Sequence, residues 1–204
     1  MKLYYSPGAC SLTDHIVLEW IGKPYEAIQV SREERQSPEY RRINPAGAVP
    51  ALVLEDGWAL TQNAAILHYL GALNPEARLL GDGSARGAAE VDRWLAFVNA
   101  DVHPSFWPFF GGLSWLQDEA MLAQGKAAAA TKLRGLFQRA DAQLEGHDWI
   151  AGERSVADPY LFVVTRWAKA VDVDLSGFGH LERFFERMLA DEGVKRALVA
   201  EGLG

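Results

Sequence analysis

The chain has 204 residues, 49% of them hydrophobic, which is enough for one large domain or two small ones with a sizeable core. Its formal net charge of -7 argues against nucleic acid as a main partner, because binding to phosphates needs a basic field. A single cysteine excludes internal disulfides and Cys-x-x-Cys metal sites. The chain shows neither a signal-peptide pattern nor an apolar run that could span a bilayer, so we expect a cytoplasmic protein without a membrane partner.

The first part of the chain alternates strand and helix patterns. A run of aromatic and apolar residues predicts the first strand, and apolar residues along one helical face follow it until Gly22. A later hairpin turns at Asp56-Gly57, a dipeptide typical of tight β-turns. We expect a small sheet with helices packed on it, made from a strand at 2–6, a helix at 12–21, a strand at 25–30, a hairpin at 50–60 and a helix at 63–73.

Beyond residue 75 every pattern is helical. Pro104 and Pro108 interrupt the first of these helices. A capping box opens a later one, with Ser155 as the cap and Asp158 as the acidic partner. The expected helices are 86–106, 121–144, one that begins after Ser155, 181–189 and 194–199. The predicted fold class is an α/β domain followed by an all-α domain.

Cys10, the only cysteine, follows the Pro7-Gly8 turn and comes just before the first helix pattern. Unpaired backbone N–H groups and the helix dipole at such a position favour a thiolate over a thiol. We therefore expect the pKa of Cys10 to fall below the roughly 8.5 of a free cysteine. The alternative is a small buried residue with an inert sulfur.

Three segments carry more information together than any of them does alone. They are MKLYYSPGACSL at the start, NPAGAVPAL at 44–52 and SVADPYLF at 155–162, followed by Trp167 and the closing AEGL. In this order they resemble the bacterial, cysteine-bearing beta class of cytosolic glutathione S-transferases. The resemblance spans essentially the whole chain.

The resemblance implies a thioredoxin-like, glutathione-binding domain at residues 1–78 and an all-helical domain at residues 84–204. It also implies a homodimer with one glutathione site per subunit, glutathione as co-substrate and no permanently bound cofactor. The bond between Val49 and Pro50 would be cis, a state found in only about 5–6% of X–Pro bonds in folded proteins.

The resemblance further implies which residues bind glutathione. Val49 would pair with the cysteinyl backbone of the ligand through its N–H and C=O groups. The helix start at Gln62-Asn63 would bind the γ-glutamyl carboxylate through its free N–H groups. The family more often has serine at the position of Asn63, and Asn63 can also cap the helix. Arg35 matches a basic position that reaches the glycyl carboxylate, yet its acidic neighbours fit a solvated surface equally well. Asp101 would approach the partner subunit's site and meet the ligand's ammonium group.

The same resemblance supplies the catalytic residues. Cys10 would lie beside the ligand sulfur, close enough for a mixed disulfide, and Ser11 can offer a hydroxyl or an N–H group to the same region. His103 matches a histidine that faces the site across the domain cleft. It could donate a hydrogen bond to the thiolate or shuttle a proton near neutral pH, whereas the alternative is a structural histidine.

We expect the second substrate to be apolar and electrophilic. Its pocket would be lined by four aromatic residues in a segment flanked by prolines and glycines: Phe106, Trp107, Phe110 and Trp115. The alternative is that this aromatic cluster belongs to the hydrophobic core. His15 lies on the apolar helix face and is interpreted as structural. The five histidines form no His-x-x-x-His pair, so we predict no metal site.

The predicted function is a detoxifying glutathione transferase, in which the glutathione thiolate attacks an electrophilic carbon. Glutathione-dependent thiol–disulfide exchange through Cys10 is a related redox activity. The alternative is a non-catalytic dimer that binds a ligand or a protein. Asn63 in place of serine keeps this alternative open, whereas the presence of both Cys10 and His103 argues against it.

Overall fold

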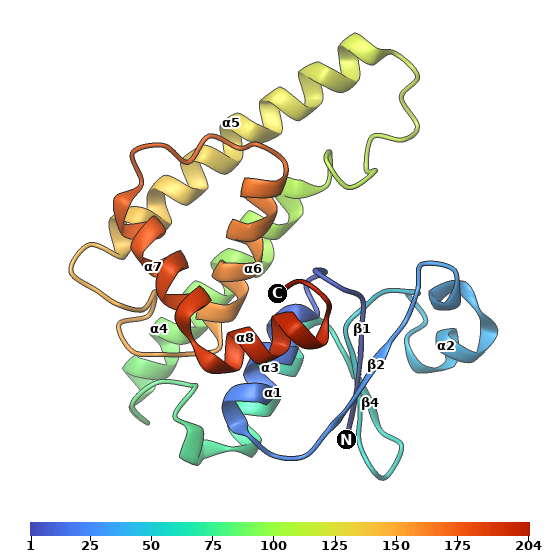
Figure 1. Ribbon diagram of the computed structural model, residues 1–204, viewed down its shortest axis with the longest axis vertical. Helices are drawn as coiled ribbons and strands as arrows, with labels where there is room; N and C mark the ends of the chain where they lie inside the picture. The colour runs from blue at the N-terminus through green and yellow to red at the C-terminus, as the bar shows by residue number, and fades with distance from the viewer.

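The computed structural model describes all 204 residues, and its first part is built around a four-stranded mixed sheet (Figure 1). The strand order is β2-β1-β3-β4. Strand β1 (Lys2–Tyr5) runs parallel to β2 (Glu26–Gln29) and antiparallel to β3 (Ala51–Val53), and β3 pairs antiparallel with β4 (Ala59–Thr61). The sheet confirms the predicted α/β class of this part of the chain.

Alternate residues of β1 face opposite sides of the sheet, as the period of two in a strand requires. Leu3 and Tyr5 belong to the main core with helices α1 (Leu12–Ile21) and α3 (Asn63–Leu73). Tyr4 faces the other side and packs edge-on against Tyr40 of α2 (Pro38–Ile43), with ring centroids 5.8 Å apart. Figure 1 shows α1 and α3 together on one side of the sheet and α2 on the other.

Helix α1 joins the sheet to the helical part of the chain. Seven of its ten residues are buried, and it packs against α3, α6 and α8. It ends at Gly22, whose φ of 71° lies in the left-handed region that glycine adopts without strain. A helix buried on so many sides brings its polar residues into the interior as well.

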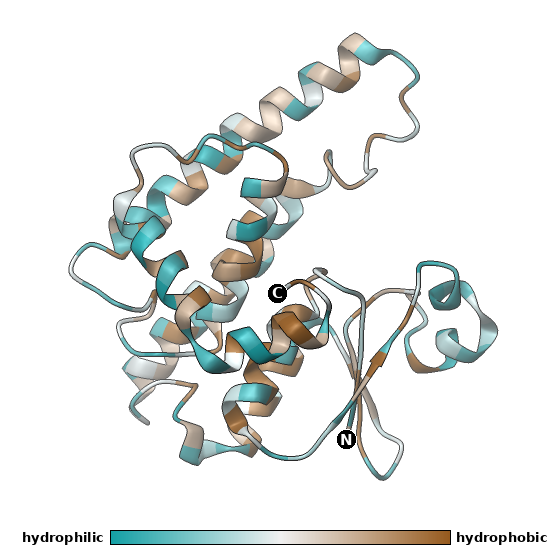
Figure 2. Ribbon diagram, in the orientation of Figure 1, coloured by the Kyte–Doolittle hydropathy of each residue, from teal (hydrophilic) through white to brown (hydrophobic).

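The rest of the chain is helical, and α6 lies at its centre with ten buried residues. Figure 2 shows hydrophobic residues concentrated where α6, α1 and α8 meet. Helix α5 extends beyond the rest of the molecule (Figure 1). The helices are α4 (Ala85–Ala96), α5 (Glu119–Gln143), α6 (Ala157–Ala170), α7 (Gly179–Ala190) and α8 (Glu192–Ala200).

The helix predicted over 86–106 does not continue as one α-helix. After α4, the segment Phe97–Val102 is a π-helix and His103–Phe106 is a 3-10 helix. Pro104 has no N–H group to donate to an α-helical ladder, which accounts for the change in hydrogen-bonding pattern at this point. The change directs the residues after 102 along the border of the two halves of the molecule.

The start of α6 has the hydrogen bonds of the predicted capping box, although the N-cap position falls on Val156, one residue after the predicted Ser155. The Ser155 N–H donates to Asp158 Oδ2 at 2.7 Å, and the Ala157 N–H donates to Ser155 Oγ at 3.3 Å. Asp158 also accepts the Ile150 N–H at 2.9 Å, so one buried carboxyl ties the preceding loop to the helix.

One further prediction concerns a single peptide bond. The Val49-Pro50 bond is cis, as the resemblance implied. None of the helices combines the length and the apolar character needed to cross a membrane.

Candidate active site

A cavity of about 520 Å³ lies between the sheet part and the helical part of the molecule. Its volume falls in the range of small-molecule sites. It is lined by Cys10, Asn44, Ala46, Ala48, Val49, Pro50, Thr61, Gln62, Asn63, Asn99, His103, Pro104, Trp107, Phe110 and Tyr160. The structure therefore gathers seven of the predicted functional residues around one space: Cys10, Val49, Gln62, Asn63, His103, Trp107 and Phe110.

Cys10 lies in the turn between β1 and α1, half-buried, with its Sγ donating to the Val49 carbonyl at 3.4 Å. Burial, followed by the nearby Asp14 carboxyl, raises the pKa of the Cys10 thiol to about 12. The N–H groups of Cys10 and Ser11 and the charge of Arg35 act in the opposite direction but are outweighed. The expectation of a lowered pKa is therefore wrong, because the loss of hydration at this position exceeds the effect of the helix start.

Ser11 faces the interior and not the cavity. It has no exposed surface, and its hydroxyl accepts the Ser6 N–H at 3.2 Å and lies 3.3 Å from the Ser6 carbonyl oxygen, to which it donates. The expectation that its hydroxyl serves the site is corrected, because the turn uses that group. Only the Ser11 N–H acts toward the cavity, through its effect on the Cys10 sulfur.

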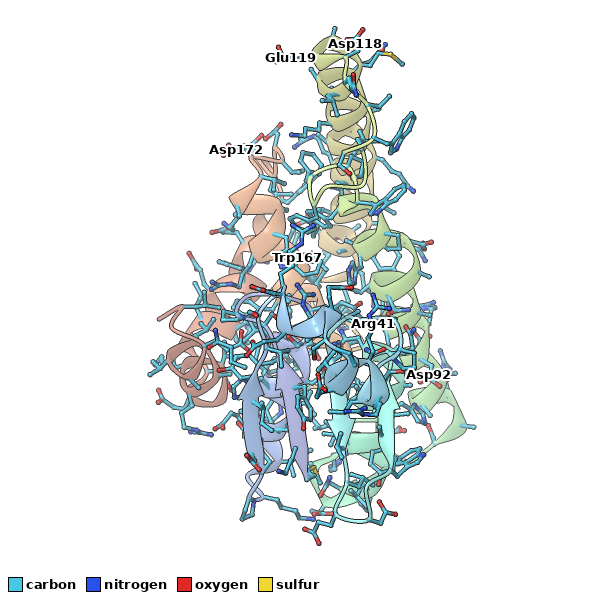
Figure 3. All side chains as sticks on the ribbon, turned by 90° about the vertical axis from the view of Figure 1, so that its right-hand side faces the viewer. Arg41, Asp92, Asp118, Glu119, Trp167 and Asp172 are labelled. Atoms are coloured by element: carbon cyan, nitrogen blue, oxygen red, sulfur yellow. The ribbon has the colours of Figure 1, made fainter.

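Two distant segments hold the turn that carries Cys10. The Gly8 N–H donates to Glu201 Oε2 at 2.8 Å, and Trp167 Nε1 donates to the Gly8 carbonyl at 2.8 Å. Figure 3 shows Trp167 at the junction of the two halves of the molecule. Glu201 also lies 3.0 Å from His15 Nδ1, and His15 is 1% exposed, so the interpretation of His15 as structural is confirmed.

Helix α3 begins at the cavity, but Asn63 is not its cap. Gln62 occupies the N-cap position with a φ of 74°, and Asn63 is the first helical residue and is buried. The Asn63 side-chain amide faces Asp14, with one of its two terminal atoms 2.6 Å from Oδ2 and 3.3 Å from Oδ1; beside an ionised carboxylate that atom is the nitrogen, which donates. The Asn63 amide thus turns toward α1, and the backbone N–H groups of the first turn of α3 remain as the donors at this end of the cavity.

His103 forms the opposite wall. Its Nδ1 lies 2.6 Å from the Tyr160 hydroxyl, and that hydroxyl donates to Asn99 Oδ1 at 3.2 Å. Its ring packs edge-on against Trp167, with centroids 4.8 Å apart. Burial lowers the pKa of His103, so the imidazole is neutral near pH 7.

The predicted aromatic wall divides into two groups. Trp107 and Phe110 line the cavity and are 64% and 53% exposed, as residues at an open mouth would be. Phe106 is fully buried and stacks behind Phe110 with centroids 5.8 Å apart, and Trp115 is 71% exposed away from the cavity lining. The expectation that Phe106 and Trp115 line the pocket is corrected, because Phe106 is packed into the core and Trp115 lies exposed outside the lining.

Two predicted ligand-binding residues lie outside the cavity lining. Arg35 is half-buried, and its Nε is a buried donor without a partner, close enough to Cys10 to affect that thiol. Asp101 is exposed in the π-helical segment. The ligand-binding roles of Arg35 and Asp101 therefore stay predictions.

Sequence reasoning missed three polar residues that the structure places at the site. Tyr160 and Asn99 hold His103, and Asp14 holds Asn63. One signal was present: Asp14 is a charged residue within the apolar stretch that forms α1. The partners of these residues come from other elements, so their contacts could not be inferred from spacing along the chain.

Comparison with known proteins gives two matching family models and a relative that matches over its full length. Residues 9–73 match the family model described as "Glutathione S-transferase, N-terminal domain", and residues 93–192 match "Glutathione S-transferase, C-terminal domain". The chain is 55% identical over 204 residues to Glutathione S-transferase GST-4.5 of Xanthomonas campestris pv. campestris, with 100% of both chains covered.

Solved structures give the same picture. A glutathione-S-transferase from Xylella fastidiosa superposes with a TM-score of 0.97 at 53% identity, covering 100% of this chain and 99% of that one. A sphingomonad glutathione S-transferase complexed with glutathione superposes with a TM-score of 0.87 at 36% identity, with 100% of both chains covered.

Proposed function

The chain belongs to the glutathione S-transferase family, and from this premise we propose how its cavity performs glutathione transfer. The protein is a glutathione transferase that uses glutathione as its co-substrate. In the reaction the glutathione thiol loses its proton, and the sulfur forms a bond to an electrophilic carbon. The leaving group departs with the electron pair of its bond and takes up the proton, so the products are the thioether and the protonated leaving group.

The observation that carries this proposal is the meeting of four ligand-binding features in one cavity: the Cys10 turn, the Val49 edge, the start of α3 and the His103 wall. Val49 offers its backbone groups to the cysteinyl part of glutathione in the manner of an added strand. The first turn of α3 receives the γ-glutamyl carboxylate, since its N–H groups lack intrahelical partners.

Two charged residues extend this placement beyond the cavity. Arg35 has a buried Nε without a partner, and we assign it to the glycyl carboxylate. Asp101 is exposed, and we assign it to the ligand's ammonium group in a homodimer, where it would approach the partner subunit's site.

His103 is the proton acceptor of the proposal. The Tyr160 hydroxyl has one proton, and because it donates that proton to Asn99 it accepts from His103 Nδ1. This arrangement leaves Nε2 with a free lone pair. The lowered pKa keeps the ring neutral, which suits a general base for the glutathione thiol.

Thiol–disulfide exchange through Cys10 is a second activity that the geometry permits, because Cys10 lines the cavity. Its thiolate would attack the glutathione sulfur of a mixed disulfide, form a Cys10–glutathione disulfide and release the other thiol. A second glutathione would then regenerate Cys10 and leave as oxidised glutathione. The raised pKa makes the thiolate scarce near pH 7, so we rank this exchange below conjugation, in which glutathione supplies its own sulfur.

A turnover panel tests the proposal. Glutathione with an aryl halide should give a thioether, and a glutathionylated disulfide should be reduced more slowly. Trp107→Ala should raise KM for the aryl halide and leave KM for glutathione unchanged. Trp115→Ala is the matched control, because it removes an exposed aromatic ring that does not line the cavity. Equal effects of the two substitutions would refute the assignment of the apolar pocket.

A further inference from the structure

Asp14 is a buried carboxyl group that the proposed reaction does not use. It has no exposed surface, and among its side-chain contacts the Asn63 amide is the only hydrogen-bonding partner. No lysine, arginine or histidine forms an ion pair with it. Burial, and secondly the charge of Glu201, raise the pKa of Asp14 well above its ordinary value. A carboxyl in this position therefore keeps its proton to higher pH than an exposed one.

The elements packed around α1 bring few charges to Asp14. Helix α1 packs against β1, α3, α6 and α8. The ionisable groups that these elements and the adjoining segments bring to its surroundings are Tyr5 from β1, Cys10 before α1, Tyr160 and Arg166 from α6, and Glu201 after α8, which is paired with His15. Arg166 acts on Glu201 and is not among the groups that shift the pKa of Asp14. An ionised Asp14 is therefore balanced only by its own backbone N–H and by the Asn63 amide.

The amide of Asn63 has a donor end and an acceptor end, and Asp14 selects between them. An ionised carboxylate can only accept, so it holds the amide nitrogen and leaves the carbonyl oxygen facing away from α1. A protonated carboxyl can donate to that oxygen. The separation of 2.6 Å from Oδ2 suits such an O–H···O bond. In that state the NH₂ group points away from α1, toward Tyr160 and the cavity that Asn63 lines.

We propose that Asp14 is a positioning residue for glutathione: when protonated it turns the Asn63 NH₂ group to the cavity, where this group donates to the γ-glutamyl carboxylate, so that the ligand binds with uptake of a proton. The proposal rests on the proposed function, which places that carboxylate at the start of α3. With Asp14 ionised, the same end of the cavity has a negative charge behind it and a carbonyl oxygen in place of a donor, and both disfavour an anion. The assignment gives Asn63 a role that a serine hydroxyl would fill without an acidic partner.

Binding of S-methylglutathione tests the proposal, since this probe has no ionisable thiol. Calorimetry between about pH 5.5 and 8, in two buffers of different ionisation enthalpy, gives both the affinity and the number of protons taken up. Wild-type affinity should fall as pH rises through the Asp14 pKa, by up to about tenfold per pH unit. The ionisable groups of the ligand titrate in the same way with every variant. A difference in pH dependence between wild type and an Asp14 variant therefore reports the titration of Asp14 alone.

The variants separate orientation from structure. Asp14→Asn presents a permanent donor to the Asn63 carbonyl, and should bind as tightly as wild type at low pH, without the proton uptake and with a flatter pH profile. Asp14→Leu removes the contact, and should bind about tenfold more weakly at low pH, as expected for a lost hydrogen bond to a charged group. Thr13→Val is the matched control on α1, because the Thr13 hydroxyl is buried without a partner, and it should behave as wild type.

Three results would overturn the proposal: parallel pH profiles of wild type and Asp14→Asn, an unchanged proton count, or an altered profile in Thr13→Val. In an Asn63→Ala background, Asp14→Asn should change nothing, and a surviving difference there would also contradict it. If Asp14→Leu fails to fold, the Asp14→Asn comparison still decides. Absence of S-methylglutathione binding to the wild type would instead refute the placement of glutathione in the proposed function.

Discussion

Cys10 illustrates how one residue responds to two opposing effects. The N–H groups at the start of α1 stabilise a thiolate, whereas burial and the Asp14 carboxyl destabilise it, and burial is the largest contribution. The sulfur still lines the cavity, where a ligand sulfur can reach it. Reactivity at this position is therefore limited by ionisation and not by access.

Cys10 should form one reversible adduct with oxidised glutathione, and the reaction should be slow near pH 7 and faster at higher pH, since only the thiolate attacks a disulfide. Intact-protein mass spectrometry over a pH series measures it. Cys10→Ala should abolish the adduct and retain conjugation to an aryl halide. Fast adduct formation at neutral pH would contradict the raised pKa.

His103→Ala should lower kcat for conjugation by roughly 10²-fold, the scale of a lost general base. Because burial lowers the pKa of His103, the ring stays neutral at pH 7, and the wild-type rate should fall only as pH drops through a pKa below the ordinary 6.5. The pH–rate profile of kcat measures this limb, and it should be absent from the alanine variant.

Tyr160→Phe is the companion variant, because it removes the hydroxyl that holds His103 Nδ1 and keeps the buried ring. It should reduce kcat less than His103→Ala and cost about 1 kcal/mol of stability, the net value of one hydrogen bond. Thermal unfolding of both variants separates the two effects. A normal rate in His103→Ala would show that this residue is structural.

At the scale of elements, polar groups at helix ends decide where the chain turns. Asp158 accepts hydrogen bonds from the Ile150 and Ser155 N–H groups, so it fixes both the start of α6 and the loop before it. Pro104, which lacks a backbone donor, stands where the π-helical segment Phe97–Val102 gives way to the 3-10 helix His103–Phe106. These local interactions place His103 and Tyr160 opposite each other.

Asp158→Ala should lower the free energy of unfolding by about 3 kcal/mol, because it leaves more than one buried donor without an acceptor. Ser155→Ala should cost only about 1 kcal/mol, the usual value of a helix cap. Chemical denaturation at constant pH measures both. Equal costs for the two substitutions would show that the contact to Ile150 contributes nothing beyond the cap.

At the scale of the whole molecule, the site forms where the sheet and the helices meet. The cavity takes Cys10 and Val49 from the sheet part and His103 and Trp107 from the helical part. Its outer edge remains open, as the exposure of Trp107 and Phe110 shows. A second subunit at this edge would complete the surroundings of a bound ligand.

We predict a homodimer at micromolar concentration, measured by sedimentation velocity. In that dimer Asp101→Asn should raise KM for glutathione by about tenfold, as expected for a lost contact to the ligand's ammonium group, and should leave the sedimentation coefficient unchanged. A monomeric wild type would refute the role of Asp101. The domain limits at residues 78 and 84 stay a prediction, which limited proteolysis of the linker can check.

The sequence by itself determined the fold class, the order of the elements and the family. Apolar periodicity, the turn at Asp56-Gly57 and the capping box at Ser155 are local signals, and the structure has a strand, a hairpin or a helix at each predicted place except over 97–106, where the predicted α-helix becomes a π-helix and a 3-10 helix. The resemblance added the cis bond before Pro50 and the family itself, which the structure and the comparisons confirm. Local patterns suffice here because hydrogen bonding and side-chain spacing within an element depend on neighbouring residues.

Only the tertiary structure decided the chemistry of the site. The pKa of Cys10 depends on burial by segments far away in the chain, and the hydroxyl of Ser11 is taken by Ser6. Phe106 belongs to the core, whereas its neighbour Trp107 lines the cavity. The amino-acid composition of this segment does not tell these two positions apart. Desolvation and contacts between elements arise only when the chain is packed, so these properties are absent from the sequence read residue by residue.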